Sequence, residues 1–202
     1  MKIGVVNISI GNVGSVLEAF RFLRHDAVAV SDPTMLEGCD LLALAGVGNY
    51  STAMGKLTTL GFAAELDRLV KAGTPLLGIC LGMQLFADQG FEDGVTKGFG
   101  WLPGTVEKIS STRAKIPHMG WNTVNPVRPE LFEGIENSTF YFMHSYHFLA
   151  ANPEDVIATV TYDDTKLVAA VKRDNVYGVQ FHPEKSQGDG LRFLKNLLES
   201  IA

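Results

Sequence analysis

Short apolar runs and amphipathic segments alternate along the first half of the chain. Apolar runs of strand length predict buried strands at residues 2–8, 27–30, 41–45 and 74–79. Apolar residues at helical spacing predict helices over residues 13–23, 62–71 and 81–88. Asn12 is placed to cap the first of these helices, and Gly73 to end the second. Because strands that alternate with helices are joined by right-handed crossovers, this half of the chain predicts a parallel sheet.

The second half is β-rich, with short strand-like pieces separated by Gly, Pro and Asn. These pieces are residues 105–109, 140–142, 157–162, 167–171 and 176–181. Residues 173–175 separate the last two and predict a hairpin, and an amphipathic helix over residues 191–198 follows. We therefore expect one α/β domain over residues 1–202: an open, mostly parallel sheet flanked by helices, with an antiparallel extension in the second half.

Composition narrows the class of protein without deciding its function. The chain has 202 residues, of which 46% are hydrophobic and 19% charged, so it can bury one full core. A formal net charge of −5 and the lack of any Lys/Arg-rich run argue against nucleic-acid binding. The apolar first residues lack the length and cleavage site of a signal peptide, and no apolar stretch approaches the ~20 residues that span a membrane. We expect a cytoplasmic protein that acts on small molecules or other proteins.

A candidate nucleophile lies where a predicted strand meets a predicted helix. Residues 78–82, Gly-Ile-Cys-Leu-Gly, have the G-x-nucleophile-x-G form of a nucleophile elbow. Such a turn places Cys80 at a helix N-terminus, where unpaired N–H groups favour the reactive thiolate, and the Leu81 N–H can donate to an oxyanion. The alternative is a buried structural cysteine, which is how we interpret Cys39. Two cysteines are too few for a disulfide framework.

A candidate base lies about a hundred residues downstream. In the sequence His182-Pro183-Glu184, positions two apart project to the same side of an extended chain, and Pro183 keeps the segment from being helical. Glu184 can therefore orient one ring nitrogen of His182 and leave the other for the thiol, as in a catalytic triad. The alternative is a surface turn with a coincidental pair.

A metal site built from His144, His147 and His182 is a further alternative. His144 and His147 are three apart in a strand-like stretch, so their side chains face opposite sides and shared ligation is awkward. We expect no metal and no cofactor.

With both motifs in view, the chain resembles the class I (triad-type) glutamine amidotransferases over essentially its whole length. The resemblance is carried by the cysteine and His-Pro-Glu motifs and by residues 11–15, 45–48, 116–122, 141–146 and 178–185. Within that family, the Gly-Val-Gly and Pro-His-Met-Gly-Trp-Asn segments are similar to those of the glutaminase subunits of histidine biosynthesis. Whether the pathway is histidine biosynthesis or a paralogous one stays open at this point.

The resemblance implies a glutaminase in which the Cys80 thiolate forms a glutamyl thioester and releases ammonia, with His182 and Glu184 completing the triad. It implies an oxyanion site between the Leu81 N–H and the backbone of Val47 and Gly48. The substrate-binding positions that it implies are Gly46, Gly48, Gln84, Glu92, Ser145 and Tyr146. For Gln84 and Glu92 the alternative is that they are ordinary solvated residues.

The resemblance also implies a heterodimer in which ammonia passes to a (β/α)₈ synthase (cyclase) subunit. The positions that match partner-facing residues are Asn12, Met119, Trp121, Tyr141 and Lys185. For Trp121 and Tyr141 the alternative is core packing. The chain departs from the family at Ala45, where a proline is usual; because proline supplies no N–H donor, we expect the chemistry to survive.

Three other functions fit the sequence less well. A cysteine hydrolase acting alone would need no partner, and the placement of Gln84 and Glu92 counts against it. A non-catalytic binding module would be free to lose residues of the triad, all of which are intact. A dinucleotide-binding domain would require a G-x-G-x-x-G pattern, which the glycines of residues 11–15 do not meet.

Overall fold

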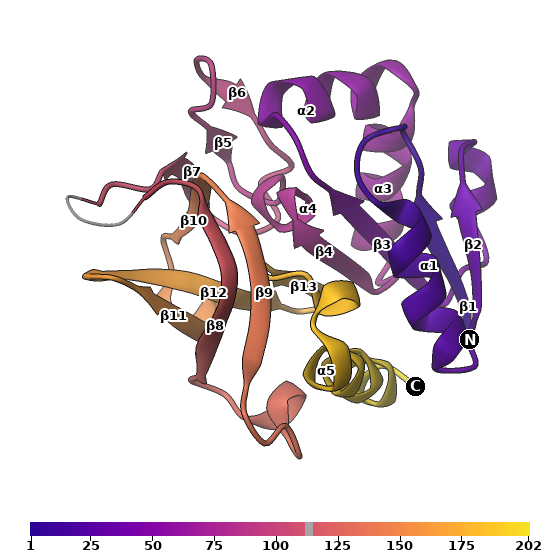
Figure 1. Ribbon diagram of the computed structural model, residues 1–202. Coiled ribbons are helices and arrows are strands. Elements are labelled where there is room, and N and C mark those ends of the chain that lie inside the picture. The colour runs from indigo at the N-terminus through magenta and orange to yellow at the C-terminus, as the bar shows by residue number, and fades with distance from the viewer. Residues whose placement is uncertain (112–114) are drawn as a thin grey trace.

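The computed structural model describes residues 1–111 and 115–202, and its centre is a nine-stranded sheet (Figure 1). Five neighbouring strands are parallel: β2 (Asp26–Val30), β1 (Lys2–Val6), β3 (Leu41–Gly46), β4 (Leu76–Cys80) and β13 (Val176–Val179). Four antiparallel strands continue the sheet: β12 (Thr165–Arg173), β11 (Val156–Tyr162), β8 (His118–Pro126) and β9 (Thr139–His144). The expected mostly parallel α/β sheet with an antiparallel extension is confirmed.

A second, smaller sheet and the helices complete the described structure. The small sheet has the order β10 (Tyr146–Ala150), β7 (Gly104–Lys108), β5 (Gln89–Gly90) and β6 (Thr96–Lys97). The α-helices are α1 (Val13–Phe22), α2 (Tyr50–Thr59), α3 (Phe62–Lys71), α4 (Leu81–Gln84) and α5 (Gln187–Ser200). Short 3₁₀ turns are η1 (Pro33–Leu36), η2 (Glu130–Phe132), η3 (Pro153–Asp155) and η4 (Pro183–Lys185).

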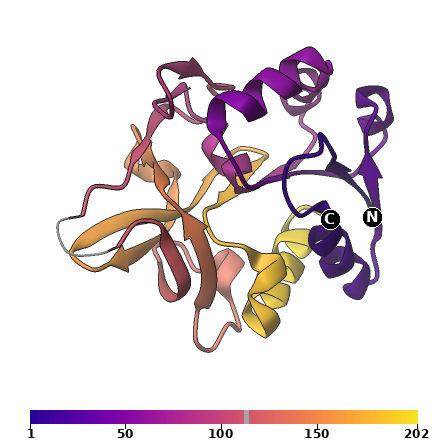
Figure 2. The same cartoon turned by 45° about the horizontal axis from the view of Figure 1, so that its top comes forward.

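Apart from the edge strand β2, the parallel strands are buried on both faces, and their side chains divide between two apolar cores. In β3, Leu41, Ala43 and Ala45 join the core under α1 and α5, whereas Leu42 and Leu44 join the core under α2 and α3. This division follows from the two-residue period of a strand. Helices therefore cover both faces, as Figure 2 shows for α2 on one side of the strands and α5 on the other.

Local signals account for several element ends. The Asn12 side chain accepts a hydrogen bond from the Ser15 N–H and caps α1, and Gly73, with φ of +95°, follows the end of α3. The predicted hairpin at residues 173–175 joins β12 to β13, and Asp174 there has φ of +50°. These turn and cap residues were readable from the sequence because their effect is local.

One predicted helix was wrong in length, and several elements were not predicted. The helix expected over residues 81–88 is only the short α4, because Phe86 and Ala87 donate to carbonyls three residues back and Asp88 donates to the Gly104 carbonyl of the small sheet. Helix α2 and strands β5, β6 and β8 were not predicted. Strands β5 and β6 have only two residues each, and α2 and β8 carry few buried side chains, so none of them shows clear apolar periodicity.

Candidate active site

Cys80 lies on a strained turn between β4 and α4. Its φ and ψ are 54° and −109°, a backbone conformation that residues other than glycine rarely adopt. Strained residues of this kind are found mostly at functional sites. The flanking glycines make the turn possible, since a Cβ on Gly78 would lie 2.3 Å from Phe86 Cζ and one on Gly82 would lie 1.7 Å from the Leu44 carbonyl oxygen. The nucleophile-elbow geometry expected from the sequence is therefore present.

The close approach of Gly82 to the Leu44 carbonyl predicts that a side chain at position 82 destabilises the fold. Because the Leu44 oxygen belongs to a central strand and cannot move aside, we expect Gly82→Ala to lower the free energy of unfolding by about 3 kcal/mol or more. Denaturant unfolding measures this value. Gly55→Ala is the matched control: its Cβ meets nothing within 4 Å in helix α2, so it should be neutral or slightly stabilising. Equal stability of the two variants would contradict the argument.

His182 and Glu184 form a buried pair beside Cys80. His182 Nδ1 lies 2.8 Å from Glu184 Oε1, and both side chains are only 3% exposed. Burial lowers the pKa of His182, but interactions with Cys80 and Glu184 outweigh it and raise that pKa from 6.5 to about 9. The pair is not a surface turn, so that alternative is excluded.

Several contacts fix the imidazole and the thiol in place. The backbone N–H of His182 donates to the Tyr141 carbonyl at 2.8 Å. The Cys80 thiol lies 3.7 Å from the Met143 carbonyl oxygen and 3.6 Å from Gln180 Nε2. His182 Nε2 is buried and makes no hydrogen bond of standard geometry to any described residue. It is therefore available to accept the thiol proton after a small adjustment.

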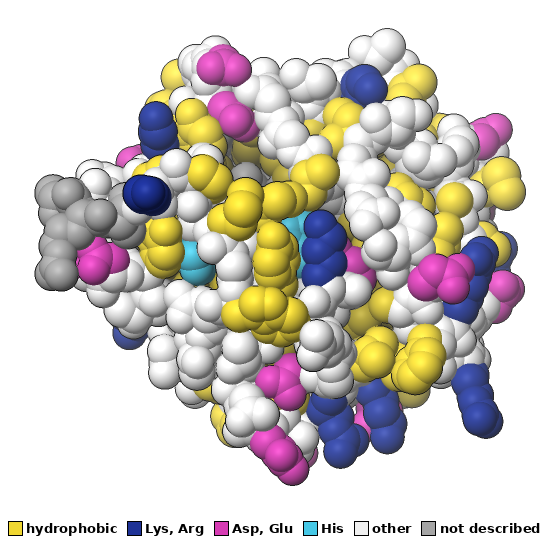
Figure 3. Space-filling view, viewed as in Figure 1, with side chains coloured by type: hydrophobic (Ala, Val, Ile, Leu, Met, Phe, Trp, Pro, Cys, Tyr) yellow, Lys and Arg dark blue, Asp and Glu magenta, His cyan; other side chains and the backbone are white. Residues whose placement is uncertain are grey.

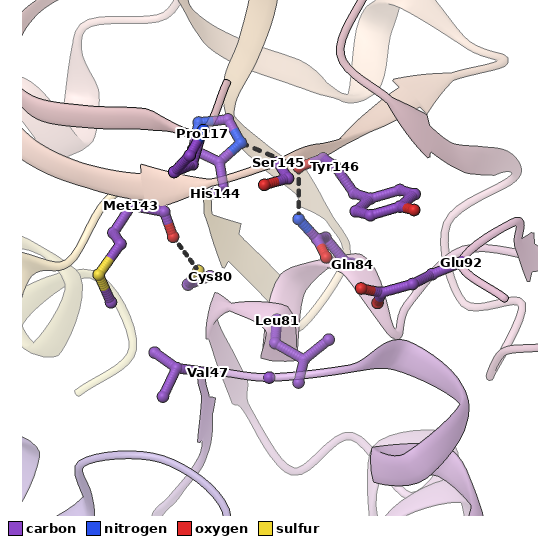
Figure 4. Close-up of a pocket in the computed structure, with 11 residues that line it drawn as sticks. Val47, Cys80, Leu81, Gln84, Glu92, Pro117, Met143, His144, Ser145 and Tyr146 are labelled. Atoms are coloured by element: carbon purple, nitrogen blue, oxygen red, sulfur yellow. Dashed lines mark hydrogen bonds between the residues drawn. The ribbon is translucent and has the colours of Figure 1, made fainter. Parts of the chain in front are cut away.

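A pocket of about 320 Å³ opens over Cys80, within the size range of small-molecule sites (Figure 4). Of the predicted oxyanion and substrate-binding residues, those that line it are Val47, Gly48, Leu81, Gln84, Glu92, Ser145 and Tyr146. Gly46 is the exception. A Cβ on Gly46 would instead meet the Leu81 side chain at 3.4 Å, so this glycine lies behind the pocket wall.

The two polar side chains expected to hold the substrate are each anchored. Gln84 Nε2 donates to the Tyr146 carbonyl at 2.7 Å and to Gln180 Oε1 at 3.0 Å. Glu92 Oε2 accepts from the Tyr50 N–H at the start of α2 at 2.7 Å. Neither residue is an ordinary solvated side chain, because both are held at the pocket by contacts distant in sequence (Figure 4).

Four of the five predicted partner-facing residues lie together on β8, β9 and η4; we call Met119, Trp121, Tyr141 and Lys185 the β8–β9 patch. Met119 is 57% exposed and Trp121 49%, so core packing is excluded for Trp121. Trp121 meets the Tyr141 ring edge-on at 6.1 Å, and Lys185 Nζ lies 5.8 Å from the same ring. Figure 3 shows hydrophobic side chains gathered over these strands. Asn12 lies apart from the patch, in a hollow beside Pro183 and Glu184.

The histidine metal site is not supported. Among residues 1–111 and 115–202, no three His, Cys, Asp or Glu side chains are arranged to hold a metal ion. His144 instead bonds to His118 and to the Tyr146 backbone.

Within the same described ranges, no helix is long and apolar enough to cross a membrane.

Gln180, Met143 and Pro117 lie at the thiol or line the pocket but were not predicted as site residues, and His144, which also lines the pocket, was considered only as a metal ligand. A signal for Gln180 existed, because it is two residues before His182 in an extended segment and projects to the same side. Met143 contributes a backbone carbonyl, which the identity of the residue does not reveal.

The model of the family described as glutamine amidotransferase class-I matches residues 21–200. The chain therefore belongs to the class I glutamine amidotransferase family. Among similar proteins are the imidazole glycerol phosphate synthase subunits HisH of Pelagibacter ubique, 38% identical over 98% of this chain and 99% of the relative, and of a Geobacillus species, 40% identical over 98% and 97%. A solved structure named glutamine amidotransferase shares the fold with a TM-score of 0.78, at 22% identity and 98% coverage of both chains.

Proposed function

We propose that this chain is the glutaminase subunit of an imidazole glycerol phosphate synthase. It hydrolyses glutamine to glutamate and ammonia and passes the ammonia to a (β/α)₈ cyclase subunit in histidine biosynthesis. The observation that carries the proposal is the strained Cys80 at the floor of a pocket, beside the buried His182–Glu184 pair. Near-full-length relatives at 38–40% identity that are named as HisH subunits support the pathway.

In the proposed reaction, Cys80 Sγ attacks the side-chain amide carbon of glutamine while His182 holds the thiol proton. The negative charge on the amide oxygen is stabilised by the Leu81 N–H and the Val47–Gly48 backbone. His182 then donates its proton to the departing nitrogen, and ammonia leaves as the thioester forms. Water, deprotonated by His182, cleaves the thioester and releases glutamate. Glu184 keeps the imidazole oriented throughout.

The remaining pocket residues hold the substrate. The Glu92 carboxylate offers a negative charge for the α-ammonium group of glutamine. Both N–H groups of Gln84 are used, so Gln84 offers its amide oxygen as an acceptor, and the Ser145–Tyr146 segment lines the pocket beside it. Gly48 forms part of the pocket wall. Gly46 contributes indirectly, because its lack of a side chain leaves room for Leu81. The required substrate is therefore a small zwitterion with a side-chain amide.

The β8–β9 patch is the proposed docking surface for the cyclase subunit, and Asn12, which lies apart from the patch, is a separate proposed contact. An exposed tryptophan and methionine beside a lysine-capped tyrosine have the composition of an interface centre. We further propose that residues 1–202 act as one glutaminase domain, since strands from both halves join one sheet, and that the complex works in the cytoplasm without a cofactor.

Glutamate release by the purified chain, alone and with the cyclase subunit and its nucleotide ligand, tests the proposal. We expect the partner to stimulate turnover at least about tenfold, equivalent to about 1.4 kcal/mol in the barrier. Glutaminase activity that ignores the partner would indicate a hydrolase acting alone. No activity in either condition would indicate a binding module.

A further inference from the structure

Three side chains that the proposed chemistry does not use form a hydrogen-bonded chain from strand β8 to the pocket. Asn122 Nδ2 lies 3.2 Å from His118 Nε2, and His118 Nδ1 lies 3.0 Å from His144 Nε2. His144 Nδ1 then lies 2.9 Å from the Tyr146 carbonyl oxygen. We call Asn122, His118 and His144 the relay.

Geometry fixes the direction of every bond in the relay. A carbonyl oxygen only accepts, so His144 carries its proton on Nδ1 and its Nε2 must accept. The donor to that nitrogen is His118 Nδ1–H, which leaves His118 Nε2 to accept from the Asn122 amide. The second N–H of Asn122 is also used, since it donates to the Thr161 carbonyl at 2.9 Å. Each imidazole therefore holds one proton, at a defined nitrogen.

The surroundings keep both imidazoles neutral and in place. His118 is buried and stacks against Phe142 at 4.6 Å and Tyr162 at 4.1 Å between ring centroids. Burial lowers the pKa of His118 to about 4 and is the largest influence that lowers the pKa of His144 to about 3. A second proton on either ring would place two N–H donors opposite each other with no acceptor between them. The buried surroundings also disfavour the added charge.

At its inner end the relay meets the residues that position the thiol. The Tyr146 carbonyl that accepts from His144 also accepts from Gln84 Nε2 at 2.7 Å, and Gln84 donates on to Gln180. Gln180 Nε2 in turn lies 3.6 Å from Cys80 Sγ. Figure 4 shows His144 and Gln84 both bonded to the backbone at Tyr146, across the pocket from Leu81.

At its outer end the relay is joined to the β8–β9 patch through the backbone of β8. Asn122 directly follows the exposed Trp121, and their side chains lie on opposite faces of the strand. In the β8–β9 pair, exposed Met119 lies opposite Met143, whose carbonyl oxygen contacts the Cys80 thiol. A displacement of β8 therefore reaches the pocket wall by both the backbone ladder and the relay.

We propose that the relay is a positioning device that transmits docking on the β8–β9 patch to the wall of the glutamine pocket. This inference rests on the proposed function, because it takes the cyclase subunit as the docking partner. Asn122 and His118 are positioning residues that act through His144 and the Tyr146 backbone. Docking would shift the Ser145–Tyr146 wall of the pocket relative to Cys80. The orientation of bound glutamine depends on that wall.

The test removes the outer link without touching the pocket. Asn122→Leu keeps the approximate shape of the side chain and deletes both donors, together with the oxygen that accepts from the Thr123 N–H. Asn125→Leu, at an exposed position of the same strand outside the relay, is the matched control. We expect Asn122→Leu to keep the basal kcat and KM for glutamine and the affinity for the cyclase subunit. Stimulation of kcat by the nucleotide-bound cyclase should fall by about 3- to 30-fold, the range for residues along coupling networks. The control should be stimulated as the wild type is.

A second measurement does not depend on the variant. A long-range proton–nitrogen correlation spectrum of the imidazole groups in the wild-type protein should show the proton on Nδ1 for both His118 and His144. A proton on Nε2 of either ring would overturn the relay, as would full stimulation of Asn122→Leu. If the cyclase subunit does not stimulate the wild-type protein, the proposed function is wrong, and the coupling proposal is wrong with it. Normal wild-type stimulation with no effect of Asn122→Leu would remove the coupling alone.

Discussion

Replacing Cys80 with alanine is expected to reduce glutamine hydrolysis by at least about 10⁴-fold, with and without the cyclase subunit. The thiol is the only nucleophile that the described structure places at the floor of the pocket beside the His182–Glu184 pair. Without it no thioester forms, and water has no activated route to the amide. Steady-state glutamate release measures the loss.

The second cysteine provides the matched control for this variant. Cys39 is also buried, but its thiol contacts the Met35 carbonyl, remote from the pocket. Cys39→Ala should therefore keep its turnover, with only a modest loss of stability. Residual activity in Cys80→Ala above the expected level would refute the nucleophile, and equal losses in both variants would point to a folding defect.

His182→Asn is expected to lower kcat by about 10²–10⁴-fold, the usual contribution of a general base. Asparagine is the informative substitution, because its amide can still donate to Glu184 from a position near Nδ1 while offering nothing at Nε2. The buried carboxylate then keeps a partner, and the loss reports on proton transfer. A kcat within a few-fold of the wild type would exclude His182 as the base.

The same residue predicts how stability depends on pH. The folded pKa of His182, about 9, exceeds its ordinary value of 6.5, so between these pH values the folded chain holds a proton that the unfolded chain has released. The stability that this proton contributes is complete below pH 6.5 and is lost as the pH rises to 9, at up to about 1.4 kcal/mol per pH unit.

Unfolding by denaturant at about pH 6 and about pH 9.5 checks the sign. The stability difference between the wild type and His182→Asn should be largest at the lower pH and shrink at the higher one. A difference that grows as the pH rises would mean that His182 is neutral in the folded protein. The Cys80–His182 interaction would then have to be reconsidered.

The sequence predicted the parts of this site that are built locally. The elbow requires glycine on both sides of Cys80, and the His182–Glu184 pair is set by a two-residue spacing around a proline, so both are visible in a few adjacent residues. The strands of the parallel sheet were visible because they are continuously apolar. Asn12 as a helix cap and the turn at Asp174 belong to the same local class.

What the sequence did not predict depends on contacts between distant segments. Gln180 matters because Gln84 and Cys80, about a hundred residues earlier, lie against it. The helix after Cys80 is short because Asp88 is drawn to the small sheet at Gly104. Strand β8 lacks an apolar period because it presents side chains to solvent, and the relay on it is defined only by pairing with β9 and β11.

The order of strands separates two kinds of change that this protein can undergo over evolution. Strand β4 supplies Cys80 and its parallel neighbour β13 leads to His182, with Ile79 opposite Val179, so the chemistry stands on one ladder. The described elements between these strands, including β8 and β9, form an excursion that leaves the parallel strands and returns to them. Under the proposed function, substitutions at exposed positions of β8 and β9 would alter the docking surface while the ladder and the triad stay intact. A change of partner would therefore require no change in the catalytic residues.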